Sequence, residues 1–387
     1  MHRAFPSFRT DLALDAMYSI RKLHALVVGQ NKDTDVLCGQ LLASAVPVSP
    51  ADCRSCSDPC DVGHEQYPSR FDVDMDTQML GSVKPYHRQI IISTGKSDWE
   101  RDITDNKQSL ASHMSEVISH SHPHSHSHNH SHSTPSHGSK PASPPANAKG
   151  VRPAAGIFRT SDSTKTSVLN GSHRTLCDED DQETVLVFPD YKVVTDVHRS
   201  LDGAQHLWDS AVDPSVGRDG AFLEKSPLKT WVLPYACVIL LCSHKKRDNR
   251  CGIAAPKLEH AFIQSLEHQG WDADTQLECP SITMGSALEE LEMTPEEREE
   301  CINTQLRGST EAKRALILKT SHIGGHKYAG NCIIYTPSGS GVWYGRVTPH
   351  DVESIVVNTI IKGLVLPPLL RGGLNLSRPN CKSLNDW

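Results

Sequence analysis

The chain has 387 residues, a formal net charge of -7 and 12 cysteines. This length allows two or three domains with a substantial apolar core, and the acidic balance offers no general basic surface for nucleic acid. No apolar run approaches the roughly 18 residues of a membrane span, so we expect neither a nucleic-acid nor a membrane partner. Cysteines without a clean secretory signal predict a reducing compartment, where thiols stay free or bind metal.

Residues 1–47 give no clear structural prediction. Basic residues at positions 3, 9, 21 and 22 resemble a mitochondrial transit peptide, but Asp11 and Asp15 argue against one because such peptides contain few acidic residues. We therefore expect a cytoplasmic protein, with a mitochondrial location as the alternative. Residues 48–105 are predicted to form an N-terminal α/β domain with a strand at Gln89–Ser93.

The N-terminal domain contains a compact C-x2-C-x3-C-x3-H pattern made by Cys53, Cys56, Cys60 and His64. This spacing allows a Cys3His zinc site. It also allows a redox dithiol at Cys53 and Cys56, which would make the protein a thiol oxidoreductase. Structural thiols are the third interpretation, and the residues alone leave all three open.

Residues 106–182 are rich in Ser, His, Pro and Asn and are centred on the run HSHPHSHSHNHSHS. Such a segment buries too little apolar surface to offset the entropy lost on ordering, so we predict a disordered His-rich insert. Its eight histidines from His120 to His137 would bind Zn²⁺, Ni²⁺ or Cu²⁺ loosely. Metal buffering and neutral low complexity both remain open.

Residues 184–370 return to a folded α/β pattern. Apolar runs predict strands at Glu183–Phe188, Tyr191–Val197 and Trp231–Cys242, the last being a central strand covered on both faces. A helix is expected to have Pro256 in its first turn and Gly270 at its cap.

The rest of this region predicts a helix, a strand, a hairpin and a last helix. The acidic stretch Glu289–Thr304 is expected to be a helical surface elaboration, and the other elements are Arg314–Ser321, Cys332–Tyr335 with Val342–Val347, and Pro349–Lys362. This β-loop-α then β-β-α order is typical of a thioredoxin-like layer, and no internal repeat is obvious. Residues 371–387 are interpreted as a C-terminal tail.

Two pairs of metal-ligand residues lie where predicted strands end. Cys242 and Cys251 enclose eight residues in CSHKKRDNRC, a loop long enough to fold back and bring both sulfurs to one iron. Gly252 would give the backbone room beside Cys251. His322 and His326 enclose three residues in HIGGH.

The two glycines between the histidines permit a tight reversal, with φ > 0, that turns both imidazoles toward one point. Two thiolates and two imidazoles suit either a [2Fe-2S] cluster or zinc. Ligand type alone does not decide between them.

The motif C-x8-C, then H-x-G-G-H, then GVWYGRVTP resembles the fungal thioredoxin-like ferredoxin family, also called sucrase/ferredoxin-like. The similarity runs over Tyr235–Pro349 and extends to CRSCSDPC and GSVKPYHRQIIISTGKSDW in the N-terminal block, whereas the His-rich insert lies outside it. The resemblance implies a C-terminal thioredoxin-like ferredoxin domain. It also implies a non-Rieske [2Fe-2S] cluster bound by Cys242, Cys251, His322 and His326.

The resemblance further implies a non-enzymatic electron carrier or redox sensor. Neutral imidazoles in place of two thiolates make the cluster less negative and raise its potential relative to all-Cys ferredoxins. Because a histidine ligand keeps a second ring nitrogen, reduction should couple to proton uptake. With no nicotinamide or flavin motif, electrons must come from an unidentified donor or reductase. The alternative from a different class is a zinc-stabilised interaction module.

Two further features bear on partners. The loop between the cysteines carries cations that suit an acidic electron donor, unless it is merely a solvated loop; they are Lys245, Lys246, Arg247 and Arg250. Asp386 and Trp387 resemble the terminal tripeptide by which cytosolic iron-sulfur clients reach their targeting complex, although Asn385 departs from its usual aliphatic residue. Glycoside hydrolysis would need opposed carboxylates, and no such pair stands out.

Overall fold

The computed structural model describes residues 30–51, 65–121, 154–221 and 227–387. The strands are β1 (Arg88–Ser93), β2 (Ile157–Phe158), β3 (Thr166–Gly171), β4 (Gln182–Phe188), β5 (Lys192–His198), β6 (Lys229–Val232), β7 (Cys237–Cys242), β8 (Asp272–Asp274), β9 (Arg314–Thr320), β10 (Cys332–Tyr335), β11 (Gly341–Tyr344) and β12 (Leu370–Leu374). They form one sheet in the order β2-β12-β11-β10-β7-β9-β3-β1-β4-β5-β6, and β8 pairs with β9.

The α-helices are α2 (Gln30–Ala43), α3 (Leu110–Ser121), α4 (Leu201–Leu207), α5 (Asn249–His268), α6 (Pro280–Met284), α7 (Pro295–Thr310) and α8 (Val352–Ser354). The 3-10 and π segments are η2 (Thr160–Asp162), η3 (Trp208–Val212), η4 (Leu288–Glu290), η5 (His326–Tyr328), η6 (Pro349–Asp351), η7 (Ile355–Ile361) and η8 (Pro367–Leu369). Among the helices of the described ranges, none has the length and apolar content needed to cross a bilayer.

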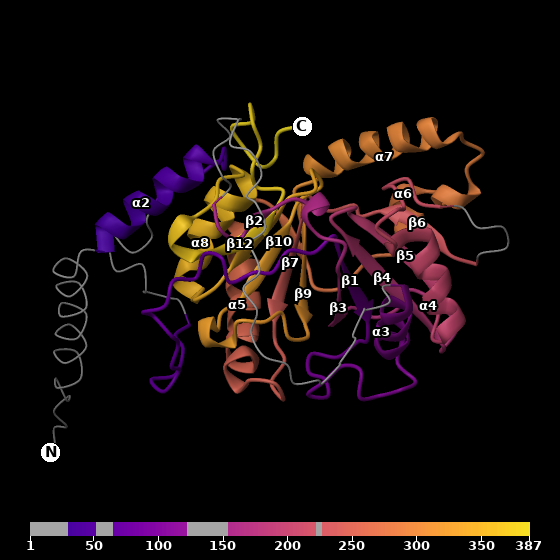
Figure 1. The fold of residues 1–387 in the computed structure, drawn as a ribbon, viewed down its shortest axis with the longest axis horizontal. Helices are drawn as coiled ribbons and strands as arrows, with labels where there is room; N and C mark the ends of the chain where they lie inside the picture. The colour runs from indigo at the N-terminus through magenta and orange to yellow at the C-terminus, as the bar shows by residue number, and fades with distance from the viewer. Residues whose placement is uncertain (1–29, 52–64, 122–153, 222–226) are drawn as a thin grey trace, which may run out of the picture.

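The two halves of the sheet repeat one topology. In the first half, β1 and β3 are parallel around α3, and β4 and β5 follow as antiparallel strands before α4. In the second half, β7 and β9 are parallel around α5, and β10 and β11 follow as antiparallel strands before α8 and η7. The predicted thioredoxin-like order therefore occurs twice, on the right and the left of Figure 1.

The two units meet at the carboxyl ends of their parallel strands. Strands β3 and β9 run antiparallel and pair only through Gly171 and Thr320, the last residues of each. The loop after β1 therefore lies against the loop after β7, and the Ser243 hydroxyl donates to the Ser97 carbonyl at 2.7 Å. The residues that follow β7 in the second unit are thus in contact with the first unit.

Apolar side chains are buried on both faces of the sheet. On one face, Phe262 of α5 packs in a cluster with Ile239 of β7 and Ile317 of β9. On the other face, Ile302 of α7 joins a cluster with Leu240 of β7. Because successive strand residues alternate between faces, a strand covered on both sides reads as a continuous apolar run.

The structure confirms most of the predicted elements and corrects two of them. Strands are present at all the expected positions, but the run Trp231–Cys242 is split into β6 and β7 around Pro234, which cannot donate a ladder hydrogen bond. The helix expected from Pro256 begins earlier, at Asn249, so Pro256 lies inside α5. Gly270 caps the helix end as expected, with φ +72°.

The predicted domain boundaries need correction. The insert predicted over 106–182 contains α3, β2 and β3, and α3 buries Leu110, Met114 and Val117 in the core. Their apolar spacing was masked by the surrounding Ser- and His-rich composition. Strands β4 and β5, assigned to the C-terminal domain 184–370, complete the first unit instead. The centre of the predicted insert, 122–153, lies outside the described residues.

Two further segments are more integrated than expected. The predicted tail 371–387 supplies most of β12 and buries Leu376 and Leu384 completely. The helix expected over Glu289–Thr304 is α7, which begins later, at Pro295, and ends at Thr310. It was expected to be a surface elaboration, yet its Ile302 and Leu306 are 0 % exposed. The few apolar residues of α7 are spaced four apart, so they form one stripe that faces the sheet. Of residues 1–47, the described part is mainly α2.

Candidate metal centre

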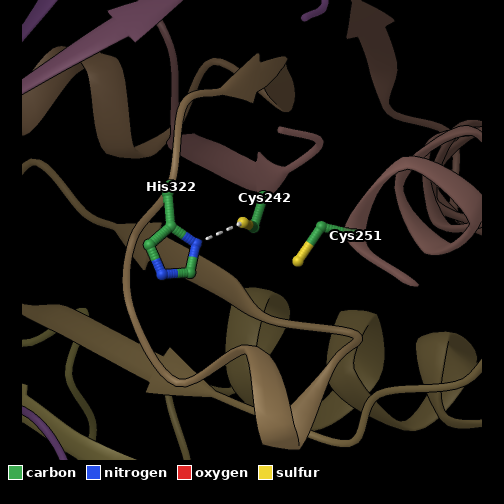
Figure 2. A group of neighbouring side chains, drawn as sticks. All are labelled: Cys242, Cys251 and His322. Atoms are coloured by element: carbon green, nitrogen blue, oxygen red, sulfur yellow. Dashed lines mark hydrogen bonds between the residues drawn. The ribbon is translucent and has the colours of Figure 1, made fainter. Parts of the chain in front are cut away.

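Three potential metal ligands converge at the carboxyl end of β7. Cys242 is the last residue of β7, Cys251 is the third residue of α5, and His322 lies in the loop after β9 (Figure 2). Their ligand atoms all lie within 4.8 Å of one another. The Cys242 Sγ and the His322 Nδ1 are 4.0 Å apart. Both cysteines are buried, and His322 is half-buried.

The fourth predicted ligand, His326, stands beside this group. It begins η5, is exposed, and its ring centroid lies 5.5 Å from that of His322 with an interplanar angle of 35°. Gly324 and Gly325 have φ values of +79° and +68°. The expected left-handed reversal is therefore present, and it places the two imidazoles side by side.

The cysteine loop is closed by the first turn of α5. Asp248 is the N-cap and accepts from the Arg250 N–H at 3.0 Å, while the Cys251 N–H donates to the Asp248 carbonyl at 3.1 Å. This position places Cys251 in the positive end of the helix dipole, which favours a thiolate. A Cβ at Gly252 would lie 2.8 Å from Cβ of Lys245, which confirms the predicted need for room beside Cys251.

The buried cysteine pair differs electrostatically from a lone buried cysteine. Hydrogen bonds to Cys251 and then His322 hold the pKa of the Cys242 thiol well below its usual range. The pKa of Cys251 is raised, first because its thiol is hydrogen-bonded to Cys242 and then by burial. In β10, burial raises the pKa of Cys332 to about 12. The pairing therefore favours the thiolate form of Cys242, which is the form that binds a metal.

Sequence reasoning missed a third histidine, His244, which lies between the two cysteines. Its Nδ1 accepts from the His322 N–H at 3.2 Å, so its Nε2 carries the proton and donates to the carbonyls of Trp99 and Glu100 at 3.1 and 2.8 Å. The side chain is 1 % exposed. His244 thus links the loop after β1 to the backbone of a predicted metal ligand. The sequence signal that could have identified His244 was its position between Cys242 and Cys251, in CSHKKRDNRC.

Sequence reasoning also missed a buried arginine, Arg371, that contacts the loop carrying His322 and His326. Arg371 of β12 donates from Nη1 to the Gly324 carbonyl at 3.1 Å and to the Asn331 Oδ1 at 2.8 Å. Asn331 in turn donates to the Gly325 carbonyl at 3.0 Å. The signal in the sequence is a single charge inside the apolar run LLRGGL, which had been divided between a domain and a tail.

The basic loop is partly neutralised by carboxylates. Lys246 pairs with Glu100 at 2.7 Å, and Arg250 pairs with Asp248 at 2.8 Å. The acidic-donor surface predicted from this loop is therefore weaker than its composition indicates. The predicted Cys53, Cys56, Cys60 and His64 pattern lies outside the described residues, as does the histidine tract beyond His120.

A cavity of about 600 Å³ occupies the corresponding place in the first unit, at the carboxyl end of β1. Its lining includes Ser93, whose hydroxyl donates to Glu183 at 2.6 Å, and burial raises the pKa of that glutamate. Arg199 pairs with Glu183 at 3.1 Å. No cysteine or histidine of the described chain lines this cavity, so it lacks the soft ligands of the second unit.

The profile of the sucrase/ferredoxin-like family matches residues 79–372. The chain belongs to the sucrase/ferredoxin-like family. The matched region contains both units and all four predicted ligands. No solved structure matches the chain.

Three curated fungal proteins show the extent of similarity to this family member. "Altered inheritance of mitochondria protein 32" of Clavispora lusitaniae is 33% identical over 135 residues, which are 35% of this chain and 34% of the relative. The protein of that name from Debaryomyces hansenii is 34% identical over 35% of each chain. "Actin patches distal protein 1" of Saccharomyces cerevisiae is 31% identical over 43% of this chain and 41% of the relative. The matches thus span less than half of each relative.

The donor set of this sucrase/ferredoxin-like protein fits a metal group. Two buried thiols, one with a lowered pKa, and two neighbouring imidazoles are suitable ligands for iron or zinc. From standard zinc bond lengths, a thiolate and an imidazole on one tetrahedral ion are about 3.6 Å apart. The 4.0 Å between Cys242 and His322 is close to that value.

Proposed function

We propose that the protein is an electron carrier or redox sensor in which Cys242, Cys251, His322 and His326 bind a [2Fe-2S] cluster. The supporting observation is the convergence of a buried thiol pair with His322, within 4.8 Å, beside a second histidine. Membership of a family whose description includes ferredoxin supports the same proposal. The cluster would supply one-electron chemistry, and the chain would hold it between a buried thiolate side and an exposed imidazole side.

The uneven burial of the ligands gives the histidine side a distinct role in this proposal. Cys242 and Cys251 are 2 % and 0 % exposed, whereas His326 is exposed and His322 half-buried. Solvent and a redox partner would therefore approach the imidazole edge. A ligated imidazole there keeps a ring nitrogen that exchanges protons with water, so electron uptake would be coupled to proton uptake.

The proposal requires an electron donor or reductase, and we place the protein in the cytoplasm, with a mitochondrial location as the alternative. We further propose that the cytosolic iron-sulfur targeting complex recognises Asp386 and Trp387. The Trp387 side chain is 45 % exposed, with the Arg307 guanidinium 5.7 Å from its ring centroid. The Asp386 carboxylate accepts from two backbone N–H groups, at Lys382 and Ser383, so the turn that presents the indole is locally ordered.

Anaerobic purification followed by visible absorption and reduced-state electron paramagnetic resonance tests the cluster. We expect a red-brown protein with a [2Fe-2S] signal that Cys242→Ser abolishes and His322→Cys alters. Cys332→Ser is the matched control, because Cys332 is a fully buried cysteine on the adjacent strand β10 and is not in the ligand group. Loss of the signal in Cys332→Ser to the same extent would contradict the assignment of ligands.

A zinc-stabilised interaction module is the second candidate, because the donor spacing is compatible with it as well. The 4.0 Å between Cys242 Sγ and His322 Nδ1 suits two ligands of one tetrahedral zinc ion, as it suits two ligands of one iron of a cluster. A colourless protein that retains one equivalent of zinc after chelator-free purification would establish this candidate. It would also remove the basis for electron transfer.

A further inference from the structure

Arg371 is a buried cation without an acidic partner in the described part of the chain. It lies in the edge-proximal strand β12, is 2 % exposed, and no carboxylate of that part lies within ion-pair distance. Buried charges are normally paired, because removing an unpaired ion from water costs several kcal/mol. The position of Arg371 therefore needs a compensating interaction.

The guanidinium is bonded to neutral groups that surround the histidine loop. Its Nε donates to the Ser82 hydroxyl at 3.1 Å, and its Nη1 reaches both the Gly324 carbonyl and the Asn331 side chain. Its centre lies 5.7 Å from the ring centroid of Tyr328, at the end of that loop. Arg371 thus contacts the loop in its middle, at Gly324, and at its end, near Tyr328.

Two glycines leave space for the guanidinium and its stem. A Cβ on Gly325 would collide with the guanidinium of Arg371, and a Cβ on Gly345 would lie 2.7 Å from its Cδ. Gly325 also has a left-handed φ of +68°, so both the backbone conformation and the space taken by Arg371 require glycine there. The path of the HIGGH loop and the position of Arg371 are therefore mutually dependent.

Nearby groups that carry negative charge supply part of the remaining compensation, and Cys242, Tyr328 and Cys251 are the largest of them. Burial lowers the pKa of Arg371 to about 10, so it stays charged at neutral pH, and negative charge on Cys242 is the largest influence that opposes this lowering. Cys251 acts in the same sense. A thiolate-bound group at this place would supply permanent negative charge near the arginine, in a site where screening by water is weak.

We propose that Arg371 is a positioning residue that holds the loop carrying His322 and His326, and a fixed counter-charge to the group bound by Cys242 and Cys251. The counter-charge half of this proposal rests on the proposed cluster, whereas the positioning half does not. At a pH high enough that no proton accompanies the electron, reduction adds one negative charge to a cluster, so a fixed cation nearby stabilises the reduced form and raises the potential. The potentials are therefore compared at such a pH.

Hydrogen exchange in the metal-free full chain tests positioning. Arg371→Lys keeps the charge but loses the fork that bonds Ser82, Gly324 and Asn331 together, and Arg371→Met loses both. We expect amides in 322–331 to exchange at least about tenfold faster in both variants, as for loss of one charge-assisted hydrogen bond. Arg314→Lys is the matched control, since Arg314 lies at the opposite end of β9 and pairs with Asp274.

Redox titration of the cluster-loaded protein tests the charge. For Arg371→Met we expect the equilibrium constant for reduction to fall at least about tenfold, which is 59 mV for a one-electron couple. Arg371→Lys and Arg314→Lys should change it by less than about threefold, because both keep the charge. This contrast separates the counter-charge from a general loosening of the loop.

Each measurement can refute its own half of the proposal without the other. Loop exchange in both Arg371 variants that matches Arg314→Lys would overturn positioning, and an unchanged potential in Arg371→Met would overturn the counter-charge. A wild-type protein without a cluster would refute the proposed function and the counter-charge together, while hydrogen exchange would still decide positioning. If Arg371→Met does not fold, exchange in Arg371→Lys decides positioning, and the potential of Arg371→Gln decides the charge.

Discussion

Adjacent glycines in the histidine loop offer a test of its packing that needs no metal. Gly324 and Gly325 both have left-handed φ values, +79° and +68°. A Cβ on Gly324 meets nothing within 4 Å, whereas one on Gly325 collides with the buried guanidinium of Arg371. The alanine variants therefore share the same backbone strain and differ in whether Arg371 must move.

The expected losses of unfolding free energy follow from these two contributions. Left-handed backbone in a non-glycine residue costs about 1–2 kcal/mol, which is the whole effect expected for Gly324→Ala. Moving Arg371 also sacrifices at least one of its hydrogen bonds to Gly324 or Asn331, and a bond to a charged group contributes about 1.5–3 kcal/mol. Gly325→Ala should therefore cost about 2.5–5 kcal/mol.

Urea denaturation of both metal-free variants, followed by tryptophan fluorescence, measures the difference. The comparison holds where the slopes with urea are equal, because a changed slope indicates a changed unfolding transition. Equal losses in the two variants would refute the reasoning, since they would mean that the guanidinium moves aside without losing any bond. A larger loss of unfolding free energy in Gly324→Ala than in Gly325→Ala would also refute it.

Two further predictions concern the core. Ile302 of α7 is 0 % exposed, so Ile302→Ala should lower the unfolding free energy by about 2–5 kcal/mol. As a control, Ile282→Ala replaces a residue that is 84 % exposed and should change the unfolding free energy by less than about 0.5 kcal/mol. Similar urea midpoints in the two variants would refute the core role of α7. Burial lowers the pKa of His173 to about 4. Because the unfolded state then binds the extra proton between about pH 6.5 and 4, stability present above pH 6.5 should fall by about 3 kcal/mol through that window. An equally steep fall in His173→Gln would exclude this histidine as the cause.

The sequence predicted best those features of the fold that depend on residues close together in the chain. Strand β7 was predicted because an apolar run covered on both faces has few alternatives, and the reversal at Gly324 and Gly325 because paired glycines permit left-handed backbone. The spacing of Cys242 and Cys251 identified two residues that the fold brings together. Each of these inferences needs only neighbours in the chain.

The missed features depend on residues far apart in the chain. Arg371 contacts Gly324 and Asn331 across 47 and 40 residues, so nothing near it in sequence reveals its partners. Helix α3 lies in a Ser- and His-rich context, and its four buried apolar residues are too few to outweigh that composition over a long window. The repeat of two units is a repeat of topology, with side chains different enough to leave no visible sequence period.

Comparison of the two units explains why, among the residues that the structure describes, only the second unit contains a candidate metal centre. Ser93 ends β1 as Cys242 ends β7, so corresponding positions carry a hydroxyl and a thiol. A serine hydroxyl bonded to Glu183 is a hard oxygen ligand at most, which disfavours the soft-metal chemistry of a thiolate. The first unit acts instead through its loop, whose carbonyls orient His244 and thereby the backbone of His322. The unit whose β1 ends in a serine therefore helps to position a predicted ligand in the unit that carries the cysteine pair.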